Sequence, residues 1–275
     1  MLLTWIDHLL DLADTPADFY SGCRKILRNV RLTFDDMDTD LQMKDAGYTS
    51  SKMTMLTKNY FHGESVATAI KLWDRRKAQA KYGSVALTTF NHFVKGKGTV
   101  EEIVQNKSKR ASVFGPCILA VSITWIKKGK ASVDIFYRTT EFAKKFPADL
   151  VFIRDVLLKD FDFEGLAVEY NFHFANVTIH PMYMVTAIPH LDDPIGYFEQ
   201  IKRKDKHFFD WTVKWTARYL CPEHKRGIEK FSQAMRVHKD AHERIKKPVI
   251  AQLQKYLRAN HPGFRNDYDE DGDDE

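Results

Sequence analysis

The sequence predicts an α+β fold, with a mixed, mostly antiparallel sheet flanked by helices. The first observation is a pair of apolar segments, residues 117–126 and 131–138, joined by a short polar stretch. The second is the helical spacing of apolar residues near both ends of the chain. The third is size, because 275 residues with 44% hydrophobic content can bury one large core.

The N-terminal part of the chain is predicted to be mainly helical. Residues 1–34 carry apolar side chains at helical spacing, and Thr15 with Pro16 is typical of the start of a second helix. A further helix is predicted over residues 53–82. It is followed by a short predicted strand over residues 83–90.

The middle of the chain is predicted to form the centre of the sheet. The segment Cys117–Ile126 is apolar on both faces, and the next strand alternates between apolar and polar residues until it closes at Arg138. Pro147 opens a predicted helix that carries Asp149 in its first turn. A third strand ends at His180, which the following proline keeps extended.

The C-terminal part is predicted to be helical from residue 194, with a long basic helix over residues 227–257. Seven carboxylates lie within residues 267–275, so we expect residues 263–275 to form an acidic disordered tail. Without these carboxylates the formal charge of +5 becomes about +12. A basic body suits a phosphate-bearing partner, although a solvated basic surface is the alternative.

Several classes of protein are excluded. No run of about 18 apolar residues occurs, so we expect no membrane span, and the acidic residues of the first helix argue against a signal peptide. Three cysteines without metal-ligand spacing suggest a reducing, cytoplasmic compartment and no disulfide framework, and we expect no metal site. Neither GxxxxGK nor GxGxxG occurs, which argues against P-loop and Rossmann enzymes.

Residues with useful chemistry lie at the ends of the predicted elements. Cys117 is a candidate nucleophile if a cation such as Arg138 lies beside it, and the alternative is a small buried core residue. Arg138 with Thr139 suits a phosphate group, or Arg138 simply emerges into solvent. Asp149 either complements a helix N-terminus or accepts a hydrogen bond in a pocket.

The third strand offers further binding residues. Asn176, Thr178 and His180 alternate along one face and could line a sugar or base site. The alternative for His180 is a structural histidine with satisfied hydrogen bonds.

These segments together resemble the thymidylate synthase superfamily, which includes deoxypyrimidine hydroxymethylases encoded by some phages. Gly115-Pro116-Cys117 is similar to the family's Pro-Cys nucleophile segment, and Arg138 follows Cys117 by 21 residues, close to the family's spacing. The resemblance covers about residues 83–183. The other matching segments are residues 85–91, 137–141, 146–149 and 176–180.

The resemblance implies a thymidylate synthase-like fold and a one-carbon transferase that forms a homodimer. Residues 1–262 would form a single catalytic domain with helical N- and C-terminal elaborations. The substrate would be a pyrimidine deoxynucleoside monophosphate, and the one-carbon donor would be 5,10-methylenetetrahydrofolate. The location would be the cytoplasm, that of the host if a phage encodes the chain.

The resemblance also implies roles for single residues. Cys117 would add to C6 of the pyrimidine. Asp149 stands where the family reads the base with Asn, and Asp at this place marks the cytidylate hydroxymethylases, so the expected conversion is dCMP to 5-hydroxymethyl-dCMP. The residues that would bind and orient the nucleotide are Arg138, Thr139, Asn176, Thr178 and His180.

Two alternatives stay open. One is a dUMP methylase or hydroxymethylase, or another modified-nucleotide enzyme on the same fold. The other is a non-catalytic basic nucleic-acid-binding protein, although direct nucleic-acid binding is not favoured.

Overall fold

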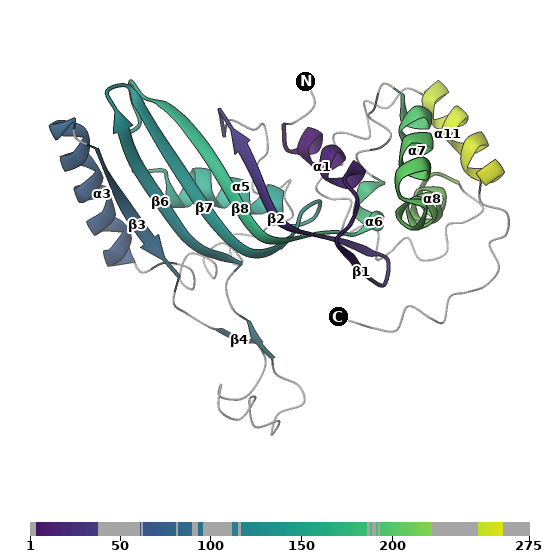
Figure 1. Ribbon diagram of the computed structural model, residues 1–275, viewed down its shortest axis with the longest axis horizontal. Coiled ribbons are helices and arrows are strands. Elements are labelled where there is room, and N and C mark those ends of the chain that lie inside the picture. Colours follow the sequence, from purple (N-terminus) through teal and green to yellow (C-terminus); the bar gives the residue numbers. More distant parts are fainter. Residues whose placement is uncertain are drawn as a thin grey trace. The chain divides into compact units, whose positions relative to one another are not determined.

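The computed structural model confirms the α+β fold (Figure 1). Contacts divide the chain into two compact units, one within residues 27–178 and the other within residues 1–26 and 179–275. The structure describes residues 4–37, 61, 63–80, 82–89, 93–95, 112–114, 117–185, 188, 191, 193–221 and 247–260.

Six strands form one sheet in the order β1-β2-β8-β7-β6-β3. The pairs β1–β2, β3–β6 and β6–β7 are antiparallel, whereas β7 and β8 are parallel. The sheet is therefore mixed and mostly antiparallel, as predicted. The strands are β1 (Phe19–Ser21), β2 (Arg24–Phe34), β3 (Gly83–Thr88), β6 (Ile118–Lys127), β7 (Lys130–Glu141) and β8 (Ala167–Ile179), and a separate pair consists of β4 (Phe93–Lys95) and β5 (Ser112–Phe114).

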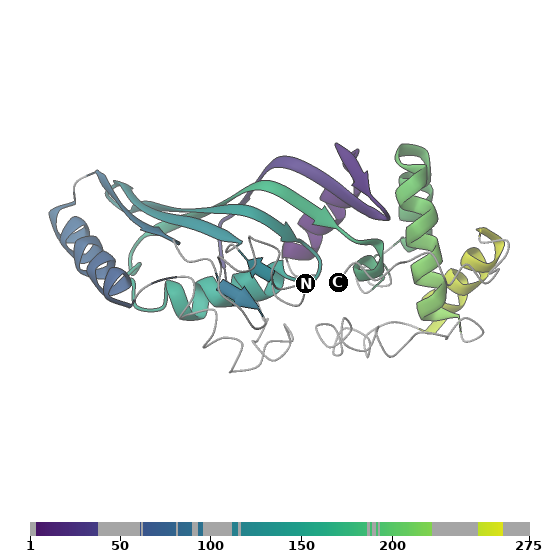
Figure 2. The same ribbon diagram turned by 90° about the horizontal axis from the view of Figure 1, so that it is seen from below.

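The unit within residues 27–178 places its helices on one side of the sheet, as Figure 2 shows. These are α3 (Gly63–Gln79), α5 (Phe146–Phe152) and the π-helix η1 (Ile153–Leu157). Aromatic rings fill the space beneath β7 and β8, where burial of large apolar surfaces stabilises the fold. The most buried of these rings belong to Tyr137, Phe142, Phe146, Phe172 and Phe174.

The other unit is mainly helical. Helix α8 (Lys206–Leu220) packs against α6 (Pro181–Met184), α7 (Pro194–Lys204) and α11 (Lys247–Asn260), and α1 (Thr4–Asp14) packs against α7. These elements confirm the helical prediction after residue 194 within the described residues. Residues 227–246 of the predicted long basic helix and the acidic tail lie outside them.

The prediction of a second helix that begins after Thr15 is wrong. Thr15 instead follows the end of α1, where its hydroxyl donates to the carbonyl of Asp11 at 2.9 Å. The chain then forms the β1–β2 hairpin, whose turn contains Gly22 with a φ of +58°, a conformation that glycine adopts without strain. Leu32 and Phe34 are buried while their neighbours in β2 are exposed, so the apolar period is two rather than 3.6.

Candidate active site at one end of the sheet

Cys117 and Arg138 lie beside each other because β6 and β7 form the predicted hairpin. The N–H of Arg138 donates to the carbonyl of Cys117 at 2.8 Å, next to the paired residues Ile118 and Tyr137. Cys117 is partly exposed, unlike a core cysteine, and Arg138 is exposed. The backbone therefore holds a thiol and a guanidinium at neighbouring positions at this end of the hairpin.

The sequence predicted that this strand ends at Arg138, but β7 continues to Glu141. The extension pairs with β8, and Thr139 lies opposite Asn176 while Glu141 lies opposite Thr178. Since β7 and β8 are parallel, their C-terminal ends lie at the same edge of the sheet as the beginning of β6. This edge therefore gathers Cys117, Arg138, Thr139, Asn176 and Thr178.

Thr178 links the ends of two strands at this edge through hydrogen bonds. Its hydroxyl donates to the carbonyl of Thr140 at 3.0 Å, and its own carbonyl accepts from the N–H of Phe142 at 2.9 Å. These bonds fasten the ends of β7 and β8 as the chain turns toward α5. Thr139 and Asn176 are both partly exposed, so they remain accessible from solvent.

Asp149 lies in the first turn of α5, as predicted, and is only 7% exposed. Its backbone N–H donates to the carbonyl of Lys145 at 3.1 Å. Burial raises the pKa of the Asp149 carboxyl from 3.8 to about 7, and the nearby charge of Lys145 offsets only part of this effect. Near neutral pH this carboxyl is therefore partly protonated.

His180 belongs to the other unit, in which its imidazole contacts a cysteine. Its Nε2 lies 3.1 Å from Sγ of Cys23, and its Nδ1 accepts from the N–H of Met182 at 3.1 Å. Sequence patterns assign Cys23 no role, because 157 positions separate it from His180 and no spacing rule connects the two residues. The predicted contact of His180 with a nucleotide stays a prediction.

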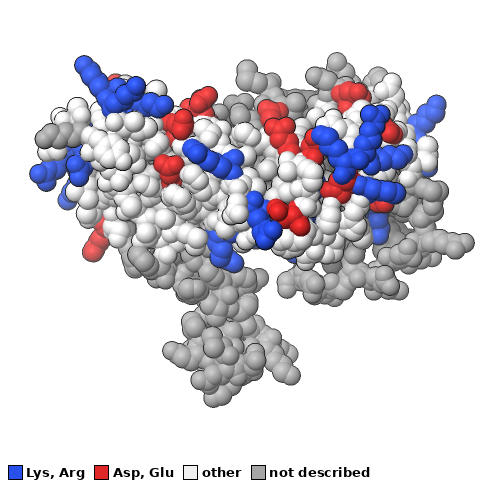
Figure 3. Space-filling model, in the orientation of Figure 1, with Lys and Arg blue, Asp and Glu red and all other residues white. Residues whose placement is uncertain are grey.

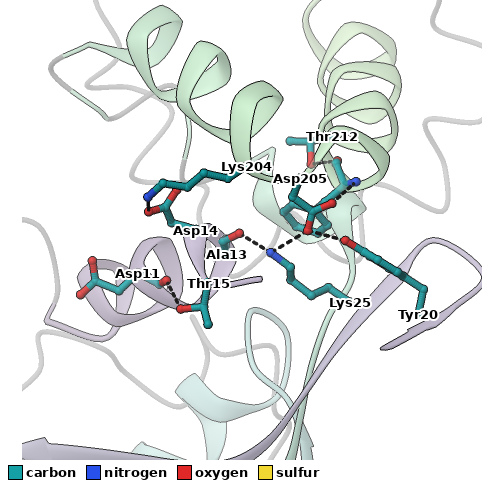
Figure 4. Close-up of polar contacts among 10 residues, drawn as sticks. Asp11, Ala13, Asp14, Thr15, Tyr20, Lys25, Lys204, Asp205 and Thr212 are labelled. Atoms are coloured by element: carbon teal, nitrogen blue, oxygen red, sulfur yellow. Dashed lines mark hydrogen bonds and ion pairs between the residues drawn. The ribbon is translucent and has the colours of Figure 1, made fainter. Parts of the chain in front are cut away.

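A buried polar cluster in the same unit surrounds Lys25, as Figure 4 shows. The Lys25 ammonium donates to the Ala13 carbonyl at 2.6 Å, lies 3.0 Å from the Asp205 carboxylate and stands 4.7 Å from the ring of Phe208. Tyr20 donates its hydroxyl to Asp205. Burial lowers the pKa of Lys25, but all three contacts are those of an ammonium, so we assign the pair as ionised. Lys25 has no exposed surface, so it is a structural cation rather than a nucleophile.

A shallow groove of about 470 Å³ lies between α3 and β3. Its lining includes Glu64, Ser65, Thr68 and Ser84, but none of the seven predicted site residues. It is thus a separate feature from the end of the sheet where Cys117 lies.

Within the described residues, no group of three or more His, Cys, Asp and Glu side chains is placed to hold a metal ion. Across the same part of the chain, no helix is long and apolar enough to cross a membrane. Figure 3 shows Lys and Arg side chains interspersed with Asp and Glu on the face that it draws.

No family model and no curated protein matches the chain in sequence. Among solved structures, the crystal structure of thymidylate synthase from T4 phage is similar, with a TM-score of 0.40 and 10% sequence identity. The match covers 64% of this chain and 76% of the phage enzyme. A likeness this partial assigns neither a family nor a function, so the fold described above rests on this chain's own elements and topology.

Proposed function

We propose that the chain is a pyrimidine nucleotide C5 one-carbon transferase that converts dCMP to 5-hydroxymethyl-dCMP. The observation that carries this proposal is the backbone pairing of Cys117 with Arg138 at the edge where β7 and β8 end. A nucleophilic thiol needs a nearby cation, and a nucleotide phosphate needs a guanidinium, so one arginine here serves both requirements.

The proposed reaction begins with covalent catalysis by Cys117. Its thiolate adds to C6 of the pyrimidine, and the electron pair of the C5–C6 double bond makes C5 nucleophilic. Arg138 and Thr139 hold the phosphate, while Asn176 bonds to the nucleotide from the neighbouring strand. Thr178 fixes the strand ends, and His180 remains a proposed contact whose Nδ1 and Nε2 already have partners in its own unit.

Asp149 is proposed to read the base. Its pKa of about 7 leaves much of the carboxyl protonated near neutral pH. A neutral carboxyl both donates and accepts, whereas a carboxylate only accepts. The neutral form can therefore donate to N3 of cytosine and accept from the exocyclic amine at the same time.

The one-carbon unit comes, on the sequence resemblance, from 5,10-methylenetetrahydrofolate, which we propose as a second substrate. C5 would bond to the methylene carbon of the folate and then lose its proton as tetrahydrofolate leaves, which gives an exocyclic methylene. Water would add to this methylene to form the hydroxymethyl group, and the Cys117 thiolate would leave C6 to restore the C5–C6 double bond. A homodimer is proposed on the same ground, and light scattering in solution would measure it directly.

The test is release of tritium from [5-³H]dCMP and [5-³H]dUMP, with and without the folate. We expect release from dCMP that requires the folate and is lost in Cys117→Ala. Cys23→Ser is the matched control, since it removes the other partly exposed thiol and should retain release. Release that survives in Cys117→Ala would overturn the assigned nucleophile.

The same assay decides between the proposed reaction and its alternatives. Release from dUMP alone would keep the mechanism and refute the assignment of cytosine to Asp149. Release from neither nucleotide, together with DNA binding that weakens steeply with salt, would refute the proposed reaction. It would favour the alternative of a non-catalytic nucleic-acid-binding protein.

A further inference from the structure

Cys23 occupies a fixed position in the turn of the β1–β2 hairpin. The turn is closed by the pair Ser21 and Arg24, and it is held from outside by His207, whose Nε2 lies 3.2 Å from the Gly22 carbonyl. Cys23 is partly exposed, and the hairpin turn defines the position of its backbone.

His180 is also fixed in position, by contacts within its own part of the chain. It is the N-cap residue of α6, and its Nδ1 accepts the N–H of Met182 at 3.1 Å. The rings of Tyr183 and Trp215 lie 5.6 and 5.9 Å from the imidazole, centroid to centroid. The imidazole is thus held both by its cap bond and by aromatic packing.

The cap bond decides which nitrogen carries the proton. A nitrogen that accepts a hydrogen bond carries no hydrogen, so the proton of the neutral imidazole is on Nε2. This N–H faces Sγ of Cys23 at 3.1 Å. His180 is therefore a hydrogen-bond donor to the sulfur, and it does not act as the base that removes the thiol proton.

A donor at sulfur stabilises the thiolate relative to the thiol, and the thiolate is the reactive form of cysteine. We propose that Cys23 is a second reactive thiolate, independent of Cys117, that is held by His180 and forms covalent adducts with soft carbon electrophiles. His180 is a positioning residue in this site. Cys117 belongs to the other unit, so this proposal does not rest on the proposed function.

The covalent step is simple to balance. The thiol proton passes to solvent before the reaction, and the thiolate attacks the electrophilic carbon. With iodoacetamide, the sulfur–carbon bond forms as the carbon–iodine bond breaks, and iodide leaves with the bonding electrons.

The experiment is the rate of carbamidomethylation of each cysteine by limiting iodoacetamide at about pH 7, followed by peptide mass spectrometry. An unperturbed thiol is only a few per cent thiolate at this pH. We therefore expect Cys23 to react about tenfold faster than the same cysteine in the urea-unfolded chain.

Two substitutions at His180 separate the sulfur contact from the helix cap. His180→Asn keeps an N-cap acceptor for Met182 but is too short to reach the sulfur, so the rate at Cys23 should fall about tenfold. His180→Gln places an amide N–H nearer the sulfur and should restore part of the rate. His173→Asn, which removes a ring that contacts Asp134 in the other unit, is the matched control and should change nothing.

Circular dichroism confirms that each variant is folded before its rates are compared. The proposal is overturned if folded His180→Asn alkylates Cys23 at the native rate. It is equally overturned if Cys23 in the native protein reacts no faster than in the unfolded chain.

Discussion

Asp205 and Asp149 are both buried carboxyls at the beginnings of helices, yet their pKa values move in opposite directions. Burial raises the pKa of Asp205, but hydrogen bonds from Tyr20, the Phe208 N–H and Lys25 outweigh it and leave a lowered value. Burial also raises the pKa of Asp149, which has only the partial opposition of Lys145. The hydrogen-bond donors around a buried carboxyl, more than its depth, therefore decide its charge.

The two carboxyls therefore give opposite pH dependences. The folded pKa of Asp205 is lowered, so its stabilising contribution is present at neutral pH and is lost on acidification below its ordinary value of 3.8. The folded pKa of Asp149 is raised, so its contribution is complete below about pH 4 and is lost as the pH rises toward 7. Ionisation of Asp205 therefore stabilises the folded state, whereas ionisation of Asp149 destabilises it.

The largest expected effect comes from breaking the Asp205 cluster with Lys25→Met. Removing one partner leaves a buried carboxylate without its cation, which costs about 3–5 kcal/mol of unfolding free energy. Urea unfolding followed by circular dichroism measures it. Lys204→Met is the control, because that ammonium pairs with Asp14 at an exposed position and should cost at most about 1 kcal/mol. Equal losses in the two variants would contradict the structural role of Lys25.

The next effect is a gain in relative stability with rising pH in Asp149→Asn. Each pKa unit corresponds to about 1.4 kcal/mol, so a rise from 3.8 to about 7 sets a ceiling near 4 kcal/mol. The variant should gain stability relative to the native protein between about pH 4 and pH 7. Thermal melts across this range measure the difference, and Asp160→Asn, at an exposed carboxylate, should show no such gain. A flat difference would show that Asp149 is ionised in the folded state.

The smallest expected effect is that of Tyr20→Phe, which removes one of the donors to Asp205. A hydrogen bond to a charged group is worth about 1.5–3 kcal/mol, and the partial exposure of Tyr20 places the loss at the lower end. Urea unfolding of this variant beside Tyr82→Phe, at a residue that is 76% exposed, isolates the contribution of the hydrogen bond to Asp205. A loss as large as that in Lys25→Met would contradict the order proposed for these partners.

Local patterns in the sequence were sufficient for the part of the fold that holds Cys117 and Arg138. Alternation in β7 and a short polar turn predicted the hairpin, and Pro147 predicted α5. The second helix was predicted wrongly because Ile26 and Leu27 suggest helical spacing, whereas Leu32 and Phe34 follow a period of two. Gly22 was the local signal that could have indicated the hairpin turn.

Long-range partners could not be predicted in the same way. Lys25 and Asp205 form a buried ion pair across 180 positions, and only the fold makes them neighbours. The raised pKa of Asp149 likewise depends on the packing around α5 rather than on its sequence neighbours. Sequence patterns specify the elements, while charge states depend on what the assembled elements place around each group.

The distribution of the three thiols also allows two different dyes to be attached to native cysteines. Cys23 and Cys117 are partly exposed and lie in different units, while Cys221 is buried. If Cys23 reacts first, a donor dye can be attached there and an acceptor dye then attached to Cys117, without adding a cysteine. Single-molecule energy transfer between the two dyes would then follow the separation of the two units in time.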